Sequence, residues 1–392
     1  MRRLLHLGTA LALILGACQD SSNPTAPDQA SERARAGALR NPTGAVYVQT
    51  NAASGNEVVA YRRGANGRLD LLGTFATGGE GTGIPRLGSQ GSLILSDDNR
   101  WLLVTNVGSS EVSVFAVSPG GLNLTDKVPS GGQMPFSLTL RGDLLYVLNA
   151  GGRTGGADNI TAFTLSGAGK LTALPGSTRP LSAANTDPAQ VEFSPDGGTL
   201  VVTEKATDKI DTYAVGSDGL ASGPTVDESN GDTPFGFAFT ASGYFVVTEA
   251  FDKAAGQAAA SSYRLAGSTG IDVISGTVRN GETDVCWTVI TRDGKYAYIT
   301  NFGSGTVSSY RIAGNGTLTL LEAVAGRTAE AQGPRDQDFG RDGRYLYVLD
   351  VGFANPATRA IHAFRVKRDG SLKKVGTFPL PAFPAVAGLA AH

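Results

Sequence analysis

Two glutamates end equivalent apolar segments of the chain, and a carboxylate in such a place can act as a base. Glu204 follows Leu-Val-Val-Thr, and Glu249 follows Phe-Val-Val-Thr. One carboxylate could activate water while Arg335 or Lys205 stabilises the charge that develops on an attacked carbonyl oxygen. Alternatively, each carboxylate caps backbone N–H groups or pairs with a neighbouring Lys or Arg. Either interpretation needs elements that bring distant parts of the chain together.

Other catalytic chemistries have little support in the residue types. The three histidines are His6, His362 and His392, and none belongs to a Ser/His/Asp pattern. Cys286 precedes Trp287 on an apolar segment without a nearby histidine to activate it, so we interpret it as a small buried residue.

No cofactor is predicted, and calcium is the alternative that stays open. Glu204, Glu249, Asp350 and nearby Asn side chains offer oxygen ligands, of which calcium takes about six to eight. The sequence has no calcium-loop motif, and it lacks the His and paired Cys residues that zinc prefers.

A repeat of about fifty residues runs through the chain. Each copy has an apolar strand, a turn such as SPDG, TRDG or GRDG, a second strand with a polar residue at its end, and two further strands. Asp-Gly suits a tight hairpin turn, where glycine carries no steric penalty at positive φ. The polar residues that end the second strands are Asn106, Asn149, Glu204, Glu249, Asn301 and Asp350. Four strands in about fifty residues are typical of a β-propeller blade.

These six copies leave a partial seventh copy, divided between the two ends of the repeat region. The segments AVYVQTN, EVVAYRR and LDLLGTF supply strands two to four, and the terminal FPAVAGLAAH supplies strand one. We therefore predict an all-β, seven-bladed β-propeller over residues 44–392, closed by pairing the C-terminal strand with the N-terminal blade. Such closure removes two unpaired sheet edges.

The first 43 residues are predicted to lie outside the propeller. Residues 1–18 combine Arg2 and Arg3, a short apolar run and Leu-Gly-Ala-Cys, and they resemble a bacterial lipoprotein signal with lipid attached at Cys18. An ordinary secretory signal is the alternative. Residues 19–43 are predicted to be a flexible tether. We expect an exported protein, periplasmic or on the cell surface, that touches a membrane only through this anchor.

The overall composition excludes some partners. Glycine accounts for 53 of 392 residues and charged residues for 17%, which suits many short strands joined by turns. The formal net charge is −2, and no Lys/Arg run exceeds two residues. Binding to nucleic acid is not expected. We expect a monomer.

The repeats resemble the lactonase-like seven-bladed propellers, the family of 6-phosphogluconolactonase and carboxymuconate cyclase relatives. The resemblance covers residues 44–390 and rests on RLGSQGSLILS, MPFSLTL, LPGSTRPLS, DPAQVEFSPDGGTLVVTEK, TPFGFAF and GPRDQDFGRDGRYLYVLD. It implies a cluster of Arg, His and Glu at one end of the central channel, often with an Arg-His pair opening an innermost strand. Here that pair is Arg335-Asp336, so the histidine is replaced.

The resemblance implies a site at the channel mouth, where loops before innermost strands and after second strands meet. Glu204, Glu249 and Arg335 are the candidate catalytic residues. The candidate ligand-binding residues are Arg86, Gln90, Asn106, Asn149, Gln190, Lys205, Asn301, Asp336 and Asp350. One predicted function is hydrolysis or isomerisation of a lactone or sugar-derived acid. The other is a catalytically silent propeller that binds a small molecule, a glycan or a partner protein.

Overall fold

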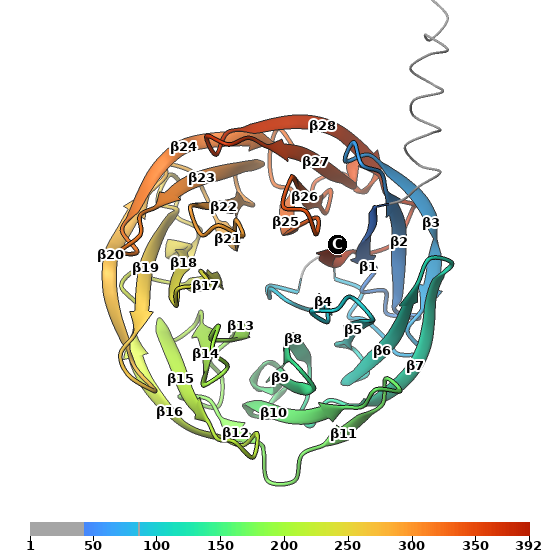
Figure 1. Cartoon of the computed structure of the whole chain (residues 1–392), viewed down its shortest axis with the longest axis vertical. Helices are drawn as coiled ribbons and strands as arrows, with labels where there is room; N and C mark the ends of the chain where they lie inside the picture. Colours follow the sequence, from blue (N-terminus) through green and yellow to red (C-terminus); the bar gives the residue numbers. More distant parts are fainter. Residues whose placement is uncertain (1–42, 85–86) are drawn as a thin grey trace, which may run out of the picture.

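The computed structural model describes residues 43–84 and 87–392, so residues 1–42, including Cys18, and residues 85–86 lie outside the described part. The described strands form seven antiparallel sheets, which stand as blades around a central channel (Figure 1). This arrangement confirms the predicted seven-bladed propeller. No helix in the described ranges is long and apolar enough to cross a membrane.

Each blade has four main strands, from an innermost strand at the channel to an outermost one. In each layer the strands run from blade one to blade seven. The innermost strands are β29 (Ala387–Ala391), β4 (Leu93–Leu95), β8 (Pro135–Arg141), β13 (Pro188–Phe193), β17 (Pro234–Phe239), β21 (Val285–Ile290) and β25 (Pro334–Phe339). The second strands are β1 (Gly44–Gln49), β5 (Trp101–Asn106), β9 (Leu144–Ala150), β14 (Thr199–Glu204), β18 (Tyr244–Glu249), β22 (Tyr296–Asn301) and β26 (Tyr345–Asp350). The third strands are β2 (Glu57–Arg63), β6 (Glu111–Ser118), β10 (Asp158–Leu165), β15 (Lys209–Val215), β19 (Ala259–Leu265), β23 (Thr306–Ile312) and β27 (Ala360–Val366).

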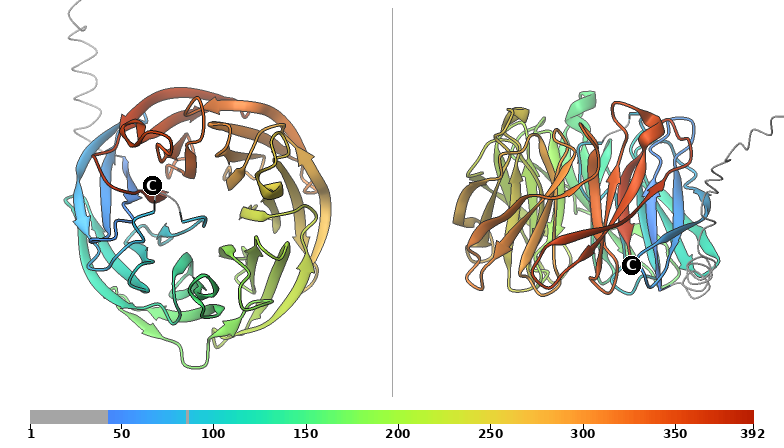
Figure 2. Two further views of the ribbon diagram at one scale, coloured as in Figure 1. Left: turned by 180° about the vertical axis from the view of Figure 1, so that it is seen from behind. Right: turned by 90° about the horizontal axis from the view of Figure 1, so that it is seen from above.

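The outermost strands complete the blades. They are β3 (Leu69–Ala76), β7 (Gly121–Pro129), β11 (Leu171–Ala173), β16 (Ala221–Glu228), β20 (Ile271–Arg279), β24 (Leu318–Arg327) and β28 (Leu372–Pro379), with β12 (Arg179–Pro180) pairing with β10 as well. Three short 3-10 helices, η1 (Gly151–Thr154), η2 (Phe251–Lys253) and η3 (Pro356–Thr358), follow second strands. They lie on one face of the ring, and the C-terminus lies toward the opposite face (Figure 2).

The ring closes through the C-terminal strand, as the sequence predicts. β29 pairs antiparallel with β1, and Val46 lies opposite Ala391. Two carboxylates of β25 then join blade seven to this strand. Asp336 accepts the backbone N–H of Leu389 at 3.0 Å, and Asp338 accepts that of Ala391 at 2.9 Å. Side chains thus connect two neighbouring innermost strands that belong to different sheets.

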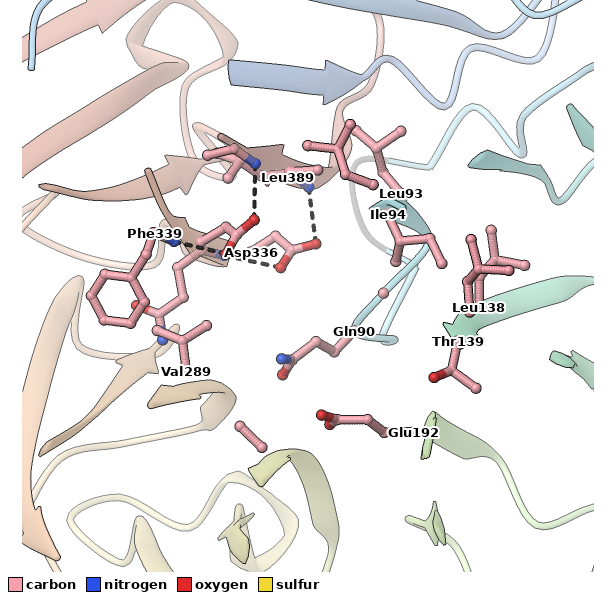
Figure 3. A pocket seen from close by; sticks show the side chains of 18 of the residues that line it. Gln90, Leu93, Ile94, Leu138, Thr139, Glu192, Val289, Asp336, Phe339 and Leu389 are labelled. Atoms are coloured by element: carbon pink, nitrogen blue, oxygen red, sulfur yellow. Dashed lines mark hydrogen bonds between the residues drawn. The ribbon is translucent and has the colours of Figure 1, made fainter. Parts of the chain in front are cut away.

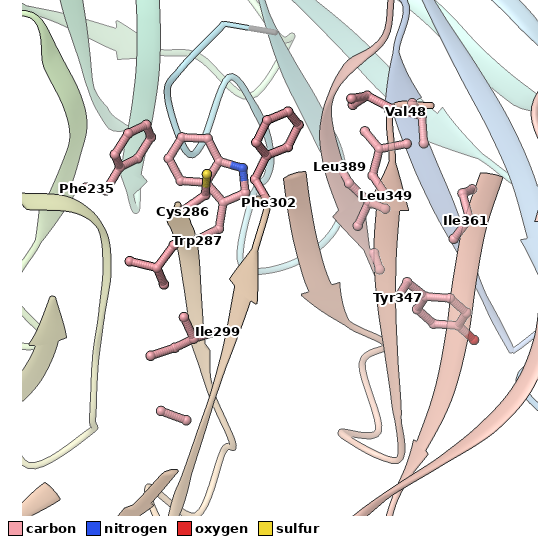
Figure 4. Packing of buried hydrophobic residues seen from close by; sticks show 14 of the residues in the cluster. Val48, Phe235, Cys286, Trp287, Ile299, Phe302, Tyr347, Leu349, Ile361 and Leu389 are labelled. Carbon is pink, nitrogen blue, oxygen red and sulfur yellow. The ribbon is translucent and has the colours of Figure 1, made fainter. Parts of the chain in front are cut away.

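Hydrophobic side chains fill the space between blades. The largest cluster includes Phe235, Cys286, Trp287 and Phe302 near the channel and continues to Leu349 (Figure 4). Cys286 is fully buried, which agrees with its interpretation as a small core residue. The Asp-Gly turns also form as expected. The glycine of SPDG, Gly197, has a φ of 78°, a conformation that favours glycine.

Candidate functional site

A segment of the chain enters the central channel between blades one and two. We call residues 87–91 the channel segment. Its backbone accepts a hydrogen bond from Leu138 of blade three at Gly91 and donates one from Gln90 to Ala189 of blade four. Figure 1 shows this part of the chain, before β4, reaching into the middle of the ring.

The side chain of Gln90 continues across the channel to blade six. Its Nε2 donates to the backbone carbonyl of Thr288 at 2.8 Å, and its Oε1 accepts the N–H of Thr288 at 3.1 Å. The amide therefore bonds to the inner edge of β21 as another strand would. Two cavities, each of about 610 Å³, lie along the channel and share no lining residue.

The first cavity, which we call the cationic cavity, opens beside η1 and η2. Its apolar wall includes Phe235 and Leu87. Its basic lining residues are Arg153, Lys205, Lys253 and Arg335, and its acidic ones are Asp187, Asp252 and Asp284. Most of them come from loops after second strands or from positions just before innermost strands. Such a concave site with a few converging polar groups is typical of small-ligand binding.

Lys205 is held firmly in the wall of the cationic cavity. Its Nζ donates to the carbonyls of Gly88 and Pro188 at 2.9 and 2.8 Å and lies 3.6 Å from an Asp187 oxygen. Nζ is also 5.0 Å from the centre of the Phe235 ring. Burial lowers the pKa of Lys205 to about 7, and Asp187 acts against this shift. A lysine with such a pKa can take up and release a proton near neutral pH.

Arg335 lies deeper, above the apolar cluster of blade six. Its guanidinium carbon is 3.6 Å from the centre of the Phe302 ring, and Nη1 lies 3.6 Å from the Cys286 sulfur. Burial raises the pKa of Cys286 to about 12, and Arg335 only partly opposes this effect. The thiol therefore stays protonated at neutral pH, whereas Arg335 keeps a fixed positive charge.

Arg153 completes this set of cations supported by aromatic rings. Its Nε donates to Asp187 at 2.6 Å, a second nitrogen contacts the same oxygen, and its guanidinium carbon lies 4.5 Å from the centre of the Phe136 ring. Cations over aromatic faces gain electrostatic stabilisation. Lys205, Arg335 and Arg153 are therefore positioned by the fold before any ligand binds.

The backbone is strained where the innermost strands begin. Asp187, Thr233 and Asp284 have φ values of 49°, 56° and 52°, and each stands directly before an innermost strand and lines the cationic cavity. The strand registers shift at the same places, as in a β-bulge. Non-glycine residues in this region are uncommon and cluster at functional sites, and bulges redirect side chains there.

The comparisons with known proteins agree with this architecture. The family model described as Lactonase, 7-bladed beta-propeller matches residues 34–175, 157–270 and 274–383. The chain belongs to the lactonase propeller family. None of the curated proteins compared with it matches.

Solved structures show the same fold over most of this lactonase propeller. A Bacteroides fragilis protein provisionally assigned as a 6-phosphogluconolactonase is 23% identical, with a TM-score of 0.65 over 88% of this chain and 97% of its own. The Pseudomonas aeruginosa periplasmic gluconolactonase PpgL is 18% identical, with a TM-score of 0.67 over 88% and 98%. At these identities the similarity establishes the fold.

Of the residues predicted for the site, Lys205 and Arg335 line the cationic cavity of the lactonase propeller. Gln90, Gln190 and Asp336 instead line the second cavity, at the opposite end of the channel. The expectation of a single convergent ring is therefore wrong for Gln90 and Gln190, because the channel segment divides the channel, whereas Asp336 also lines a small cavity beside Arg335. Arg86 lies outside the described residues.

The polar residues that end the second strands lie inside the blades. None of the six, Asn106, Asn149, Glu204, Glu249, Asn301 and Asp350, lines either of these two cavities. Their side chains bond to neighbouring strands and to the connections from the preceding blade. Asn301, for example, accepts from Asn280 at 3.0 Å and donates to Ser308 at 2.8 Å.

The two candidate catalytic glutamates follow the same rule. Glu204 accepts hydrogen bonds from the hydroxyls of Ser182 and Thr207, both at 2.5 Å. Glu249 accepts one from Ser261 at 2.5 Å, and burial raises the pKa of its carboxyl group. Each carboxylate also accepts a backbone N–H, from Ser182 for Glu204 and from Gly231 for Glu249, which is the capping role of the alternative interpretation. Their neighbours Lys205 and Ala250 are the residues that reach the cationic cavity.

The sequence did not single out several residues of this cavity. Arg153 and Lys253 lie in η1 and η2, which are loops between second and third strands. The GGRTGGADN stretch forms the loop that contains η1, and nothing in its composition marks Arg153 as a site residue. Asp187, Thr233 and Asp284 share a detectable signal, a polar residue immediately before each innermost strand. The described residues contain no group of three or more His, Cys, Asp and Glu that could hold a metal ion.

Proposed function

We propose that this lactonase propeller is an exported enzyme that hydrolyses a lactone of a sugar-derived acid in the cationic cavity. The observation that carries the proposal is the placement of Lys205 and Arg335. Both side chains are more than nine-tenths buried and still line one cavity of about 610 Å³. Fixed cations in a site partly shielded from water stabilise the negative charge that develops on the carbonyl oxygen. They also stabilise the carboxylate of the product.

The near-neutral pKa of Lys205 suits it for both proton transfers of the reaction. Its neutral amine takes a proton from water as the water oxygen bonds to the lactone carbonyl carbon. Arg335 stabilises the resulting oxyanion. When the ring C–O bond breaks, the leaving alkoxide takes the proton back from the Lys205 ammonium. The product is a hydroxy acid whose carboxyl group releases its proton to solvent, and the carboxylate stays near the guanidinium until release.

Support from relatives concerns the type of substrate and the compartment. The P. aeruginosa neighbour is named a periplasmic gluconolactonase, and the B. fragilis neighbour is provisionally a 6-phosphogluconolactonase. Residues 1–18 have the features of an export signal with a lipid-acceptor cysteine. Export would give the enzyme access to lactones outside the cytoplasm.

A panel of aldonolactones and dicarboxylate lactones tests the proposal. We expect Lys205→Met and Arg335→Met to lower kcat/KM by about 100-fold or more, since each removes a charge that acts in the transition state. Lys209→Met is the matched control, because Lys209 lies nearby on β15 but pairs at the surface with Glu228. Unchanged turnover in both cavity variants would overturn the assignment.

The glutamates are tested in the same assay. Glu204→Gln and Glu249→Gln should retain most of the turnover, because neither carboxylate lines the cationic cavity. Loss of turnover in a folded Glu204→Gln protein would restore that carboxylate as the base. Binding of the open-chain aldonate to wild type, without turnover of any lactone, would identify a binding protein instead.

A further inference from the structure

The second cavity of the channel differs from the first in its chemistry. We call it the carboxyl cavity. Its lining includes His392 at the C-terminus, which lies toward the face opposite η1 and η2 (Figure 2), and Figure 3 shows side chains that line it. Its acidic lining residues are Asp97, Glu192, Asp336 and Asp338, and its basic ones are Arg292 and Arg341, with His392 beside them. Both arginines are exposed.

Glu192 is the carboxylate that faces into this cavity. In Figure 3 its side chain extends from β13 toward Gln90 in the middle of the channel. One oxygen accepts from Gln190 at 2.9 Å, and the carboxylate also accepts the backbone N–H of Phe239. Asp336 and Asp338 are less available, because each binds two backbone N–H groups. Glu192 is therefore the acid best placed to meet a bound molecule.

One buried acceptor among the described lining residues, on Gln337, lacks a donor. Gln337 is 2% exposed, and its Nε2 donates to the carbonyls of Trp287 and Tyr298 at 3.0 and 2.7 Å. Its Oε1 is buried without a hydrogen-bond partner among the described residues. Buried acceptors without donors are costly, so a ligand that supplies N–H groups would be favoured here.

Aromatic side chains make up the rest of the recognition surface. Phe239 and Phe339, both partly exposed, line the carboxyl cavity together with Ile94. A carboxylate beside aromatic rings is suited to an organic cation, because the ring faces and the acid both attract positive charge. The described residues offer no group of acids and histidines that could hold a metal ion, which favours an organic cation over a metal.

We propose that the carboxyl cavity is a second ligand site, which binds a small organic cation with N–H donors, an ammonium or a guanidinium compound, on Glu192. The channel segment separates this site from the cationic cavity, so the proposal does not depend on the lactonase function. Burial raises the pKa of Glu192 to about 8, and cation binding must displace its proton. The cation should therefore bind more tightly above about pH 8.

Calorimetry with propylguanidinium tests this site, since that ion keeps its charge at every pH used. We expect saturable binding at about pH 9, weaker by about tenfold or more at about pH 6 and in Glu192→Gln. Propylurea, the neutral isostere, should not bind. Lys205→Met should bind as wild type does, because Lys205 lines the other cavity.

A second variant keeps the Glu192 carboxylate and reduces the volume of the carboxyl cavity. Ala238 lines the carboxyl cavity, and Ala238→Phe should block the cation while circular dichroism stays unchanged. Equal binding of propylguanidinium by wild type, Glu192→Gln and Ala238→Phe would overturn the proposal. A lack of saturation at about 50 mM propylguanidinium and about pH 9 would also overturn the proposal. Only binding with a free energy weaker than about 2 kcal/mol would escape detection at that concentration.

Discussion

Gln90 and Thr288 are 198 residues apart in sequence and face each other across the channel, where the Gln90 amide bonds to both the N–H and the carbonyl of Thr288. This pair fixes the channel segment, whose Gly88 carbonyl in turn accepts a hydrogen bond from Lys205. The Gln90 side chain therefore contributes, together with the backbone hydrogen bonds of the channel segment, to the division of the channel and to the position of the proposed base.

Removing that side chain should affect both stability and activity. We expect Gln90→Ala to lower the free energy of unfolding by about 1–3 kcal/mol, because two buried backbone groups of Thr288 lose their partner. Lys205 should also become less well positioned, lowering kcat more than it changes KM. Urea denaturation and steady-state kinetics measure these effects. The exposed Gln257→Ala is the control, and a similar loss in both variants would contradict the role of the pair.

The pH dependence of turnover should follow Lys205. If its amine is the base, kcat/KM rises through about pH 7 as the ammonium loses its proton. Asp187 favours the charged form, so Asp187→Asn should lower the pKa of Lys205 further and move this rise to lower pH. A pH–rate profile of both proteins gives the result. A shift toward higher pH in the variant would rule out Lys205 as the titrating group.

The stability of the propeller should depend on pH through Glu192. Burial raises the pKa of Glu192 to about 8, so the folded protein holds a proton that the unfolded chain releases near pH 4. Stability contributed by this site is full below about pH 4 and falls as the pH rises to about 8. Glu192→Gln should therefore gain stability relative to wild type over this range. We expect about 1–2 kcal/mol at pH 8, reduced by the partial exposure of the side chain.

Urea denaturation of both proteins at several pH values measures that difference. At about pH 4 the two curves should nearly coincide. A difference that is constant with pH would show that Glu192 does not titrate between the folded and unfolded states.

Closure of the ring should make the C-terminus far more sensitive to truncation than the predicted tether. Deleting residues 387–392 removes β29, its pairing with β1 and the partners of Asp336 and Asp338. We expect such a protein to be unfolded or aggregated at 37 °C, because an open ring exposes two strand edges. Deleting residues 19–42 should leave the melting temperature nearly unchanged. Calorimetry and size-exclusion chromatography compare the two.

The predicted lipid anchor can be tested separately from the propeller. In a bacterial host, Cys18→Ser should move the protein from the membrane fraction to the soluble fraction, because lipid attachment needs the thiol. Labelling with radioactive palmitate should disappear at the same time. Equal membrane association of both proteins would favour an ordinary secretory signal.

The sequence alone determined the blade architecture, because each blade is a local unit. Asp-Gly turns, alternating strands and a polar residue ending each second strand recur within about fifty residues, and local hairpins need little tertiary context. The divided closing blade was also predictable, since AVYVQTN and FPAVAGLAAH are incomplete without each other. Lys205 and Arg335 were identified from their types and from the family pattern.

Only the tertiary structure decided which polar residues face the channel. Glu204 and Lys205 are adjacent in sequence, yet the carboxylate turns into the blade and the amine reaches the cavity. Local bulges at the starts of the innermost strands, with positive φ at Asp187 and Asp284, lie in the same cavity wall as Lys205. The channel segment then placed Gln90 and Gln190 in a different cavity from Lys205 and Arg335. Periodicity cannot predict this, because the hydrogen bond from Gln90 to Thr288 depends on how the closed ring brings distant blades together.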